Sequence, residues 1–384
     1  MAIDNKDKKI LNVPPLRFPE FTEEWKAEQL DNIATLSKGI GISKEQLSED
    51  GEPCILYGEL YTKYKSEIIK QVESKTDING SLSKRSKAND VIIPCSGETA
   101  VDIATARCVP FDNILFGGDL NVISLHQYDG AFMSYQLNGK RKYDIARVAQ
   151  GVSIVHLYGE HLKAIKTYNP TLPEQQKIAK LLSLLDDRID TQNKIIEKLQ
   201  SLIKGIAQHC IKESTSGNTY VKLGDICQIT TGKLDANAQV DNGIYPFFTC
   251  AEQPFKIDSF AFDTEALLIS GNGANLGYIN YYKGKFNAYQ RTYVLDLFSE
   301  NIQYIKWALK VLLPKRIAIE KSSSNTPYIV LSTLTDLRLP IPCKSKQSFI
   351  ANLMQSLERK LSNQIAQYDS YNYLKQYLLR QMFI

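Results

Sequence analysis

Histidine and cysteine, the side chains that most often bind metals or act as bases and nucleophiles, are few and scattered in this chain. The four histidines are His126, His156, His161 and His209. His156 and His161 could share a metal ion, but surface or core positions are the commoner role of such histidines. The seven cysteines form no C-x-x-C pair, which argues against a zinc finger and a disulfide framework. We therefore predict no metal site.

Motifs for nucleotide chemistry are also missing from the sequence. There is no G-x-x-x-x-G-K-[ST] loop for the phosphates of ATP. The segment 271–277 has G-x-G-x-x-x-G spacing, which differs from the dinucleotide-binding fingerprint, and no acidic residue marks a ribose contact. The proline-proline-aromatic motif of amino-methyltransferases is absent, since Pro14 and Pro15 are followed by Leu16. These absences favour a protein that binds over one that catalyses.

A long amphipathic helix is predicted in the middle of the chain, from Thr171 to Lys212. Its apolar residues recur at alternating steps of four and three, which is the a/d seam of a coiled coil. Thr171 and Glu174 have capping-box spacing, and Pro173 suits the first turn. The helix would be on the order of 50–60 Å long and needs a partner. The seam, with one polar break, includes Ile178, Leu182, Leu185, Ile189, Gln192, Ile196 and Leu199.

The end of the chain supplies a matching helix. When the sequence is shifted by 172 residues, the C-terminal segment repeats the seam, and Gln364 falls on Gln192. Tyr368, Tyr371 and Lys375 also occupy seam positions, so this second helix should pack less regularly. Its other seam residues include Ile350, Leu357, Leu361 and Leu378.

The segments before the two helices correspond as well. Leu30, Ile33, Leu36 and Gly39 match Leu223, Ile226, Ile229 and Gly232 without a gap, so the repeat covers nearly half the chain. Beta-branched and aromatic runs between glycine and asparagine turns predict strands at 91–95, 101–109 and 120–125, and at 266–269, 277–282 and 292–297. Helical segments are predicted at 131–137 and 302–313. The fold class is therefore α+β, with two tandem α/β domains and two long helices.

Boundaries follow from composition. We predict a flexible charged tail at 1–15, the first domain at 16–170, the central helix at 171–213, the second domain at 214–342 and the last helix at 343–384. Small polar residues at 213–218 form the joint between the two halves.

Charge and hydropathy limit the possible partners. The 46 basic and 42 acidic residues give a net charge of +4, so any nucleic-acid surface must be local. No signal-peptide core and no run of 18 apolar residues occurs, and we predict a cytoplasmic protein without a membrane partner.

Two similar domains on a rigid spacer suit double-stranded DNA, which offers separated recognition elements. Basic residues would hold phosphates, and polar residues in glycine loops could read base edges, although solvated surface or a plain turn is the alternative for each. The candidates are Lys140, Arg141, Lys142 and Arg147, then Lys315, Arg316 and Lys321, and in the loops Ser96, Gly97, Glu98, Ser270, Asn272, Asn275 and Arg291.

The run 170–179, PTLPEQQKIA, leads into the heptad helix and resembles type I restriction–modification specificity subunits. The opening LRFPEF from Leu16, with Trp25 and Leu30, resembles them too. The duplicated layout matches this family over nearly the whole chain. In the second copy Leu172, Pro173 and Glu174 become Lys344, Ser345 and Lys346, so the start of the second helix departs from the pattern.

The resemblance implies a non-catalytic subunit. Each domain would read one half of a split DNA site, and the helices would pack antiparallel and set the spacer. Two methyltransferase subunits with S-adenosylmethionine would dock and methylate adenine, and two motor-nuclease subunits using ATP and Mg would join them. This chain would bind no cofactor itself. In an antiparallel pair, Gln192 and Gln364 would face each other as a polar layer that fixes the register.

Two other functions remain open at this point. The first is a coiled-coil scaffold without a DNA role, which would show no preference for any duplex. The second is an enzyme with an unrecognised site, such as a nuclease, which metal-dependent cleavage by the isolated chain would reveal.

Overall fold

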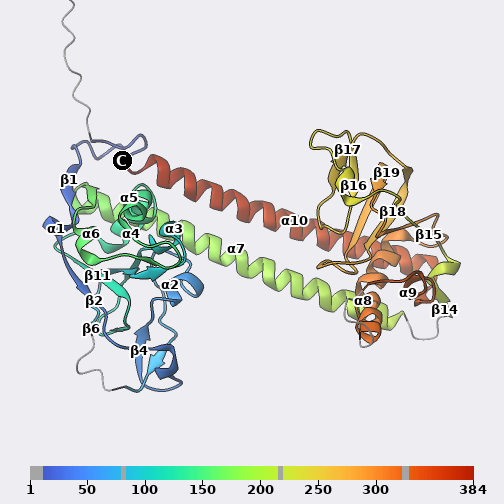
Figure 1. The fold of residues 1–384 in the computed structure, drawn as a ribbon, viewed down its shortest axis with the longest axis horizontal. Coiled ribbons are helices and arrows are strands. Elements are labelled where there is room, and N and C mark those ends of the chain that lie inside the picture. The colour runs from blue at the N-terminus through green and yellow to red at the C-terminus, as the bar shows by residue number, and fades with distance from the viewer. Residues whose placement is uncertain (1–11, 79–83, 215–218, 322–327) are drawn as a thin grey trace, which may run out of the picture. The chain divides into compact units, whose positions relative to one another are not determined.

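The computed structural model describes residues 12–78, 84–214, 219–321 and 328–384. The chain divides into two compact units, shown in Figure 1. Unit 1 consists of Met1–Asn193 with Gln367–Ile384, and unit 2 consists of Lys194–Ala366. Two long helices, α7 (Leu172–Glu213) and α10 (Lys344–Gln381), each contribute one part to each unit.

The main sheet of unit 1 is antiparallel, with the strand order β2-β11-β7-β9. Its strands are β2 (Ala34–Lys38), β11 (Leu120–Leu125), β7 (Asp90–Pro94) and β9 (Arg107–Val109). Because side chains alternate along a strand, Val91 and Ile93 pack with Met133 of helix α4 (Gly130–Asn138). Ile92 points the other way and packs with Phe116. Both faces of the sheet are therefore buried.

A second sheet in unit 1 has the order β3-β5-β4-β10-β6. Its strands are β3 (Leu47–Ser48), β5 (Lys75–Thr76), β4 (Glu52–Ile55), β10 (Leu115–Phe116) and β6 (Lys84–Arg85). Two-stranded ribbons pair β1 (Lys26–Gln29) with β13 (Lys166–Asn169), and β8 (Ser96–Gly97) with β12 (Val155–His156). The short helices are α1 (Leu30–Ile33), α2 (Glu59–Thr62), α3 (Ala100–Ile103), α5 (Lys142–Val148) and α6 (Gly159–Lys163).

Unit 2 contains a sheet with the order β15-β20-β18-β19-β16-β17. Its strands are β15 (Gln228–Thr231), β20 (Thr292–Asp296), β18 (Phe262–Ser270), β19 (Ile279–Ala288), β16 (Tyr245–Phe248) and β17 (Phe255–Ile257). A ribbon pairs β14 (Thr219–Lys222) with β21 (Arg338–Ile341), and the helices are α8 (Ile302–Lys321) and α9 (Leu331–Thr335). Leu267 and Ile269 pack with Tyr304 of α8, while Leu268 faces Phe286.

The internal repeat is visible in the strand order. The order β15-β20-β18-β19 in unit 2 corresponds to β2-β11-β7-β9 in unit 1, and every pairing in both sets is antiparallel. Gly39 directly follows β2, and Gly232 directly follows β15. A Cβ on Gly39 would lie 2.0 Å from Gly117 O, and a Cβ on Gly232 would lie 1.9 Å from Ala288 O. This repeat, with its two long helices, confirms the predicted fold class.

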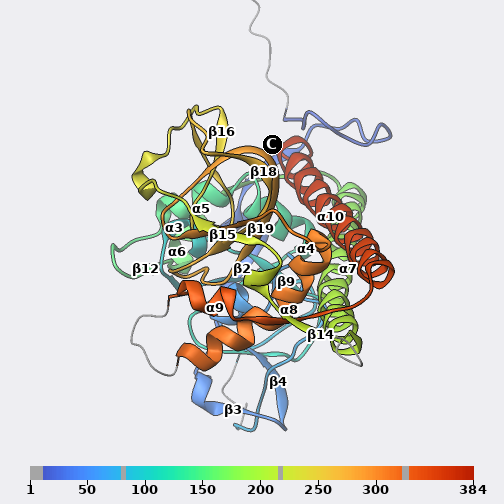
Figure 2. The same ribbon diagram turned by 90° about the vertical axis from the view of Figure 1, so that its right-hand side faces the viewer.

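The long helices, labelled α7 and α10 in Figures 1 and 2, pack antiparallel within each unit. In unit 1, Asp186 of α7 contacts Lys375 of α10, and Ile178 shares a cluster with Met382. In unit 2, Lys346 Nζ donates to the carbonyl of Glu213, which places the start of α10 at the end of α7. Of the predicted seam, Ile178, Leu182, Gln192, Ile196, Leu199, Ile350 and Leu378 are buried, while Leu185, Ile189, Leu357, Leu361 and Gln364 are half-buried.

The starts of the two long helices differ from the sequence expectation. Glu174 does not close a capping box, because its carboxylate accepts two hydrogen bonds of 2.7 Å from Arg17 and one of 3.3 Å from Trp25. The start of α10, which departs from the family pattern, lies at Lys344, and Gln347 Nε2 donates to Pro342 O at 2.9 Å. A glutamine bond to the preceding proline carbonyl thus stabilises a start that lacks the motif.

Some local predictions were wrong or fall outside the described residues. The run 101–109 is not one strand, because Thr99 caps α3 by accepting a hydrogen bond from the Asp102 backbone, and only β9 is extended. Residues 1–11 of the predicted tail are not described, whereas Pro14 is buried and Asn12 O accepts from Trp25 N. The predicted joint at 213–218 is described only at Glu213, the last residue of α7, and at Ser214.

Candidate nucleic-acid interface

Three segments of the first domain meet around a cavity of about 660 Å³: the region of α2, the region from β8 to α3, and the residues just before β12. The predicted residues Ser96, Gly97 and Glu98 line it together with Tyr57 and Tyr61. We call this space the tyrosine cavity. Tyr57 and Tyr61 are 39% and 38% exposed, so the aromatic side chains are accessible from solvent.

The tyrosine cavity is held together by hydrogen bonds between its segments. Tyr61 donates from its hydroxyl to Ser96 O at 3.0 Å, and burial raises the pKa of Tyr61, with a further contribution from Asp102. The phenol therefore stays protonated as a donor. Ser96 Oγ also lies 3.3 Å from His156 Nδ1. A Cβ on Gly97 would lie 2.9 Å from the Tyr61 hydroxyl, so a glycine suits this close approach.

The corresponding loop of the second domain also brings predicted residues together. Gly271 N donates to Arg291 O at 2.8 Å, which joins the loop after Ser270 to the turn between β19 and β20. Asn272 and Asn275 both contact Cys250, through Cys250 Sγ to Asn272 Oδ1 at 3.0 Å and Asn275 Nδ2 to Cys250 O at 3.0 Å. The Arg291 side chain is exposed. Two amides and one guanidinium thus belong to one group of loops.

The basic residues of α8 lie next to this group. A Cβ on Gly277 would come within 2.6 Å of Ile317 Cδ1, so the loop packs directly on the helix. Lys315 is exposed, and Arg316 forms an ion pair of 2.8 Å with Glu320. Lys321 is the last residue of α8, and its side chain lies outside the described part of the chain.

The predicted basic patch of the first domain has a different setting. Arg141 donates to Ile384 O at 2.9 Å, pairs with Asp144 at 3.1 Å and lies 5.4 Å from the ring centre of Tyr168. These contacts favour a structural role for Arg141, which joins α5 to the end of the chain. Its neighbours are more accessible, since Lys140 and Lys142 are half-buried and Arg147 is 77% exposed beside Asp144.

Sequence reasoning missed the aromatic and apolar residues on these loops. Tyr57, Tyr61 and Ile154 surround the tyrosine cavity, and Ile154 is 61% exposed. In the second domain Tyr328 is 58% exposed, and the next residue, Ile329, donates its N–H to Gly271 O. A tyrosine beside a glycine turn was the sequence pattern that could have indicated these residues. Exposed aromatic side chains are typical of recognition surfaces.

A buried ion-pair group holds α10 against the first domain. Lys375, a predicted seam position, lies 2.5 Å from Glu67 and 2.7 Å from Asp186. Asp186 also accepts from the hydroxyl of Tyr135 at 2.7 Å. Burial lowers the pKa of Lys375, but the attraction of Glu67 and Asp186 outweighs it and leaves the pKa raised. The lysine is therefore a structural cation.

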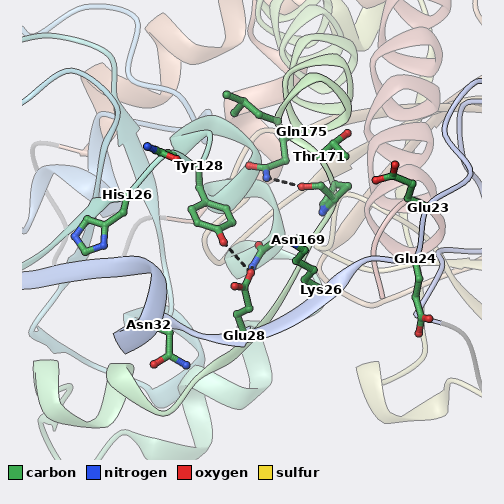
Figure 3. Close-up of a pocket in the computed structure, with 13 residues that line it drawn as sticks. Glu23, Glu24, Lys26, Glu28, Asn32, His126, Tyr128, Asn169, Thr171 and Gln175 are labelled. Atoms are coloured by element: carbon green, nitrogen blue, oxygen red, sulfur yellow. Dashed lines mark hydrogen bonds between the residues drawn. The ribbon is translucent and has the colours of Figure 1, made fainter.

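A second pocket, of about 400 Å³, lies beside the first turn of α7 (Figure 3). Glu23, Glu24 and Glu28 line it, which makes its wall acidic. Figure 3 shows Tyr128 pointing toward Glu28, and its hydroxyl donates to Glu28 Oε2 at 2.8 Å. Asn169 Nδ2 donates to the same carboxylate at 3.2 Å. An acidic wall disfavours phosphate, so this pocket is a poor candidate for binding the DNA backbone.

Two further features are absent from residues 12–78, 84–214, 219–321 and 328–384. No group of three or more His, Cys, Asp and Glu side chains there is arranged to hold a metal ion. Nor does any helix in these ranges have the length and apolar character needed to cross a membrane.

Residues 22–201 and 215–368 match the type I restriction modification DNA specificity domain. These two matches cover most of the chain, so the protein belongs to this family, and the family prediction is confirmed. The two matched ranges also reproduce the internal repeat. Membership makes the chain a type I restriction–modification specificity subunit with target-recognition domains.

Known specificity subunits show similarity of different extent. The EcoDI specificity subunit of Escherichia coli is 44% identical over 137 residues, which are 36% of this chain and only 30% of that protein. The MjaVIII specificity subunit of Methanocaldococcus jannaschii is 23% identical over 411 aligned residues, covering 92% of this chain and 90% of that one. The strong similarity is therefore local, and the weaker one extends along the chain.

The fold also resembles a solved structure. The S subunit of a type I restriction-modification system from M. genitalium has a TM-score of 0.69 and 19% identity, covering 97% of this chain and 99% of that chain. At this identity the likeness supports the fold alone.

Proposed function

We propose that this specificity subunit reads a split, asymmetric site in double-stranded DNA, one half with each globular domain. The observation that carries the proposal is that each domain has a glycine-containing segment after the corresponding strand, Ser96-Gly97-Glu98 after β7 and Gly271-Asn272-Gly273 after β18, each joined by hydrogen bonds to neighbouring segments. Repeated folds with different loop residues suit two half-sites of different sequence.

The loops of the second domain combine the contact types that sequence reading requires, and the first domain carries its acidic and basic candidates on separate segments. Base edges are read by polar side chains, and phosphates are held by cations and backbone N–H groups. In the second domain Asn275 and Arg291 belong to the loops, and Lys315 lies on the adjoining helix. In the first domain Glu98 lines the tyrosine cavity, while Lys140, Lys142 and Arg147 are candidates for phosphate contact.

The long helices are proposed to set the unspecified gap between the two half-sites. The antiparallel packing of α7 and α10 within each unit supports this role, because a helix of fixed length makes a rigid spacer.

The catalytic work is proposed to belong to partner chains. Two methyltransferase subunits would bind S-adenosylmethionine and methylate adenine, and two motor-nuclease subunits would use ATP and Mg. This division of labour agrees with a sequence that carries no recognised catalytic motif. A solved structure whose title names complex assembly of the type I R-M system resembles this fold, with a TM-score of 0.58 and 16% identity.

Selection of bound duplexes from a randomised library tests the proposal. The chain is purified with its methyltransferase partner, and bound DNA is sequenced over a series of salt concentrations. We expect two short motifs separated by a fixed gap, with affinity that falls as salt rises because phosphate contacts release counterions. Unselective binding, or a flat salt response with no enriched motif, would instead favour the scaffold function.

A further inference from the structure

The tyrosine cavity has carboxylates but no lysine or arginine among the described residues that line it. Glu98 and Asp102 are its two acidic residues, and Tyr57, Tyr61 and Ile154 supply aromatic and apolar surface. A site of this composition repels phosphate, so it is unsuited to the DNA backbone. If the cavity faces bases, its carboxylates suit groups that donate hydrogen bonds.

The two carboxylates are not equally available to a ligand. Asp102 belongs to the first turn of α3, and its Oδ2 accepts from Thr99 Oγ1 at 2.6 Å. Glu98 is exposed and has no hydrogen bond or ion pair among the described residues. Gly97, the residue before it, is packed close to the Tyr61 hydroxyl. The loop is therefore fixed while its acceptor remains unused.

The chemistry of base edges limits which base Glu98 can contact. In the major groove cytosine presents the N4 amino donor and no acceptor of its own, whereas adenine presents its N6 donor beside the N7 acceptor. A carboxylate can accept a hydrogen bond from the cytosine amino group, whereas beside adenine it would be repelled by the N7 acceptor. Resting on the proposed function, we propose that Glu98 is a specificity-determining residue that accepts a hydrogen bond from the N4 amino group of a cytosine in the half-site read by the first domain.

The second domain carries different side chains on the loop that follows the corresponding strand. Cys95 N donates to Asp119 O as Gly271 N donates to Arg291 O, so Asn272 corresponds to Ser96 and the carboxylate of Glu98 lies two residues further along its loop. The first domain thus presents a carboxylate and the second an amide at different places on these loops. This difference suits an asymmetric site read by a repeated fold.

The test is the methylation motif written by the whole complex in cells. DNA is sequenced by single-molecule methylation detection from cells that carry the methyltransferase partner with the wild-type chain, Glu98→Gln, Glu98→Ala or Glu49→Ala. Glu98→Ala should weaken the preference for one cytosine of the first half-site by about tenfold, and Glu98→Gln should shift that position toward adenine. Glu49→Ala removes an exposed carboxylate that does not line the cavity, so it is the matched control for charge and should leave the motif unchanged.

The outcomes separate this inference from the proposed function. An unchanged motif with Glu98→Ala overturns the inference, as does a uniform loss of methylation at all sites or a change in the second half-site. If the complex with the wild-type chain methylates no split motif, the proposed function fails before the variants are compared.

Discussion

Gln175 and Gln347 stand 172 residues apart and make the same two hydrogen bonds at the starts of the two long helices. Gln175 Nε2 donates to Pro170 O at 2.8 Å, and its Oε1 accepts from Asp129 N at 2.9 Å. Gln347 does the same with Pro342 O at 2.9 Å and Asn301 N at 3.0 Å. Both glutamines are 1% exposed. Each one therefore fastens a long helix to the helix of its own domain, since Asp129 and Asn301 precede α4 and α8.

Removing either glutamine should destabilise the unit that contains it. Gln175→Ala leaves the buried Pro170 carbonyl and Asp129 N–H without partners, which costs about 1–3 kcal/mol. Urea unfolding can be followed by fluorescence in a Trp307→Phe background, where Trp25 alone reports on unit 1. Gln176→Ala, at an exposed position of the same turn, is the matched control and should change the midpoint little. Equal midpoints for Gln175→Ala and its parent would contradict this role.

The two glycines of the repeat should respond to alanine in the opposite direction to Gly205 of helix α7. At Gly39 a Cβ would meet Gly117 O and at Gly232 it would meet Ala288 O, so each alanine should cost about 1–3 kcal/mol. Gly205 lies within α7 with nothing within 4 Å of its Cβ position, and Gly205→Ala should stabilise by about 0.5–1 kcal/mol. Thermal unfolding of the three variants gives the comparison. Stabilisation by Gly39→Ala or Gly232→Ala would refute the close approach.

Lys375 should be the most sensitive cation of the long helices. Lys375→Met leaves Glu67 and Asp186 buried without compensation, which is expected to cost about 3–5 kcal/mol. Adding Glu67→Gln and Asp186→Asn should recover part of that loss, measured by urea unfolding in the Trp307→Phe background. Lys70→Met breaks an exposed pair with Asp187 in the same unit and should change little. A similar small effect at Lys375 would mean that the buried group is dispensable.

The pH dependence of the Lys375 contribution follows from its raised pKa. A lysine with a raised folded pKa stabilises the protein fully below its ordinary value of 10.5 and loses that contribution as pH rises through the folded pKa. The difference in unfolding free energy between wild type and Lys375→Met should therefore be flat near neutral pH and shrink only above about 10.5. A difference that already shrank between pH 6 and 9 would assign the effect to another group.

The pairing of Gln192 with Gln364 stays a prediction. Gln192 is 5% exposed on α7, and Gln364 is half-buried on α10. If they form a polar layer that fixes the register, the double variant Gln192→Leu with Gln364→Leu should raise stability and change the gap length that is recognised. Unfolding midpoints and the gap in the methylated motif report the two effects. A variant unaltered in both would refute the prediction.

Local patterns in the sequence were enough to predict the framework. The seam from Ile178 to Leu199 and its C-terminal copy gave the long helices, because heptad spacing depends only on nearby residues. The run 120–125 is strand β11 with the predicted bounds, and the repeat of Gly39 at Gly232 marks equivalent turns. Residues close in sequence decide these features.

Contacts distant in sequence could not be predicted in the same way. Glu174 had capping-box spacing, yet its partner Arg17 stands 157 residues away, and Arg141 bonds Ile384 across 243 residues. The tyrosine cavity joins three separate segments, so Glu98 was visible as a candidate while Tyr57 and Tyr61 were not. Such contacts depend on packing that periodicity does not encode.

Single-molecule methylation sequencing tests the central claim most directly. DNA is compared from cells that carry this chain with its neighbouring methyltransferase and from cells that lack only this chain. The account predicts a split motif with a fixed gap, methylated on adenine in both strands and lost on deletion. Unchanged methylation on deletion, with the methyltransferase shown to be expressed and active, would contradict it.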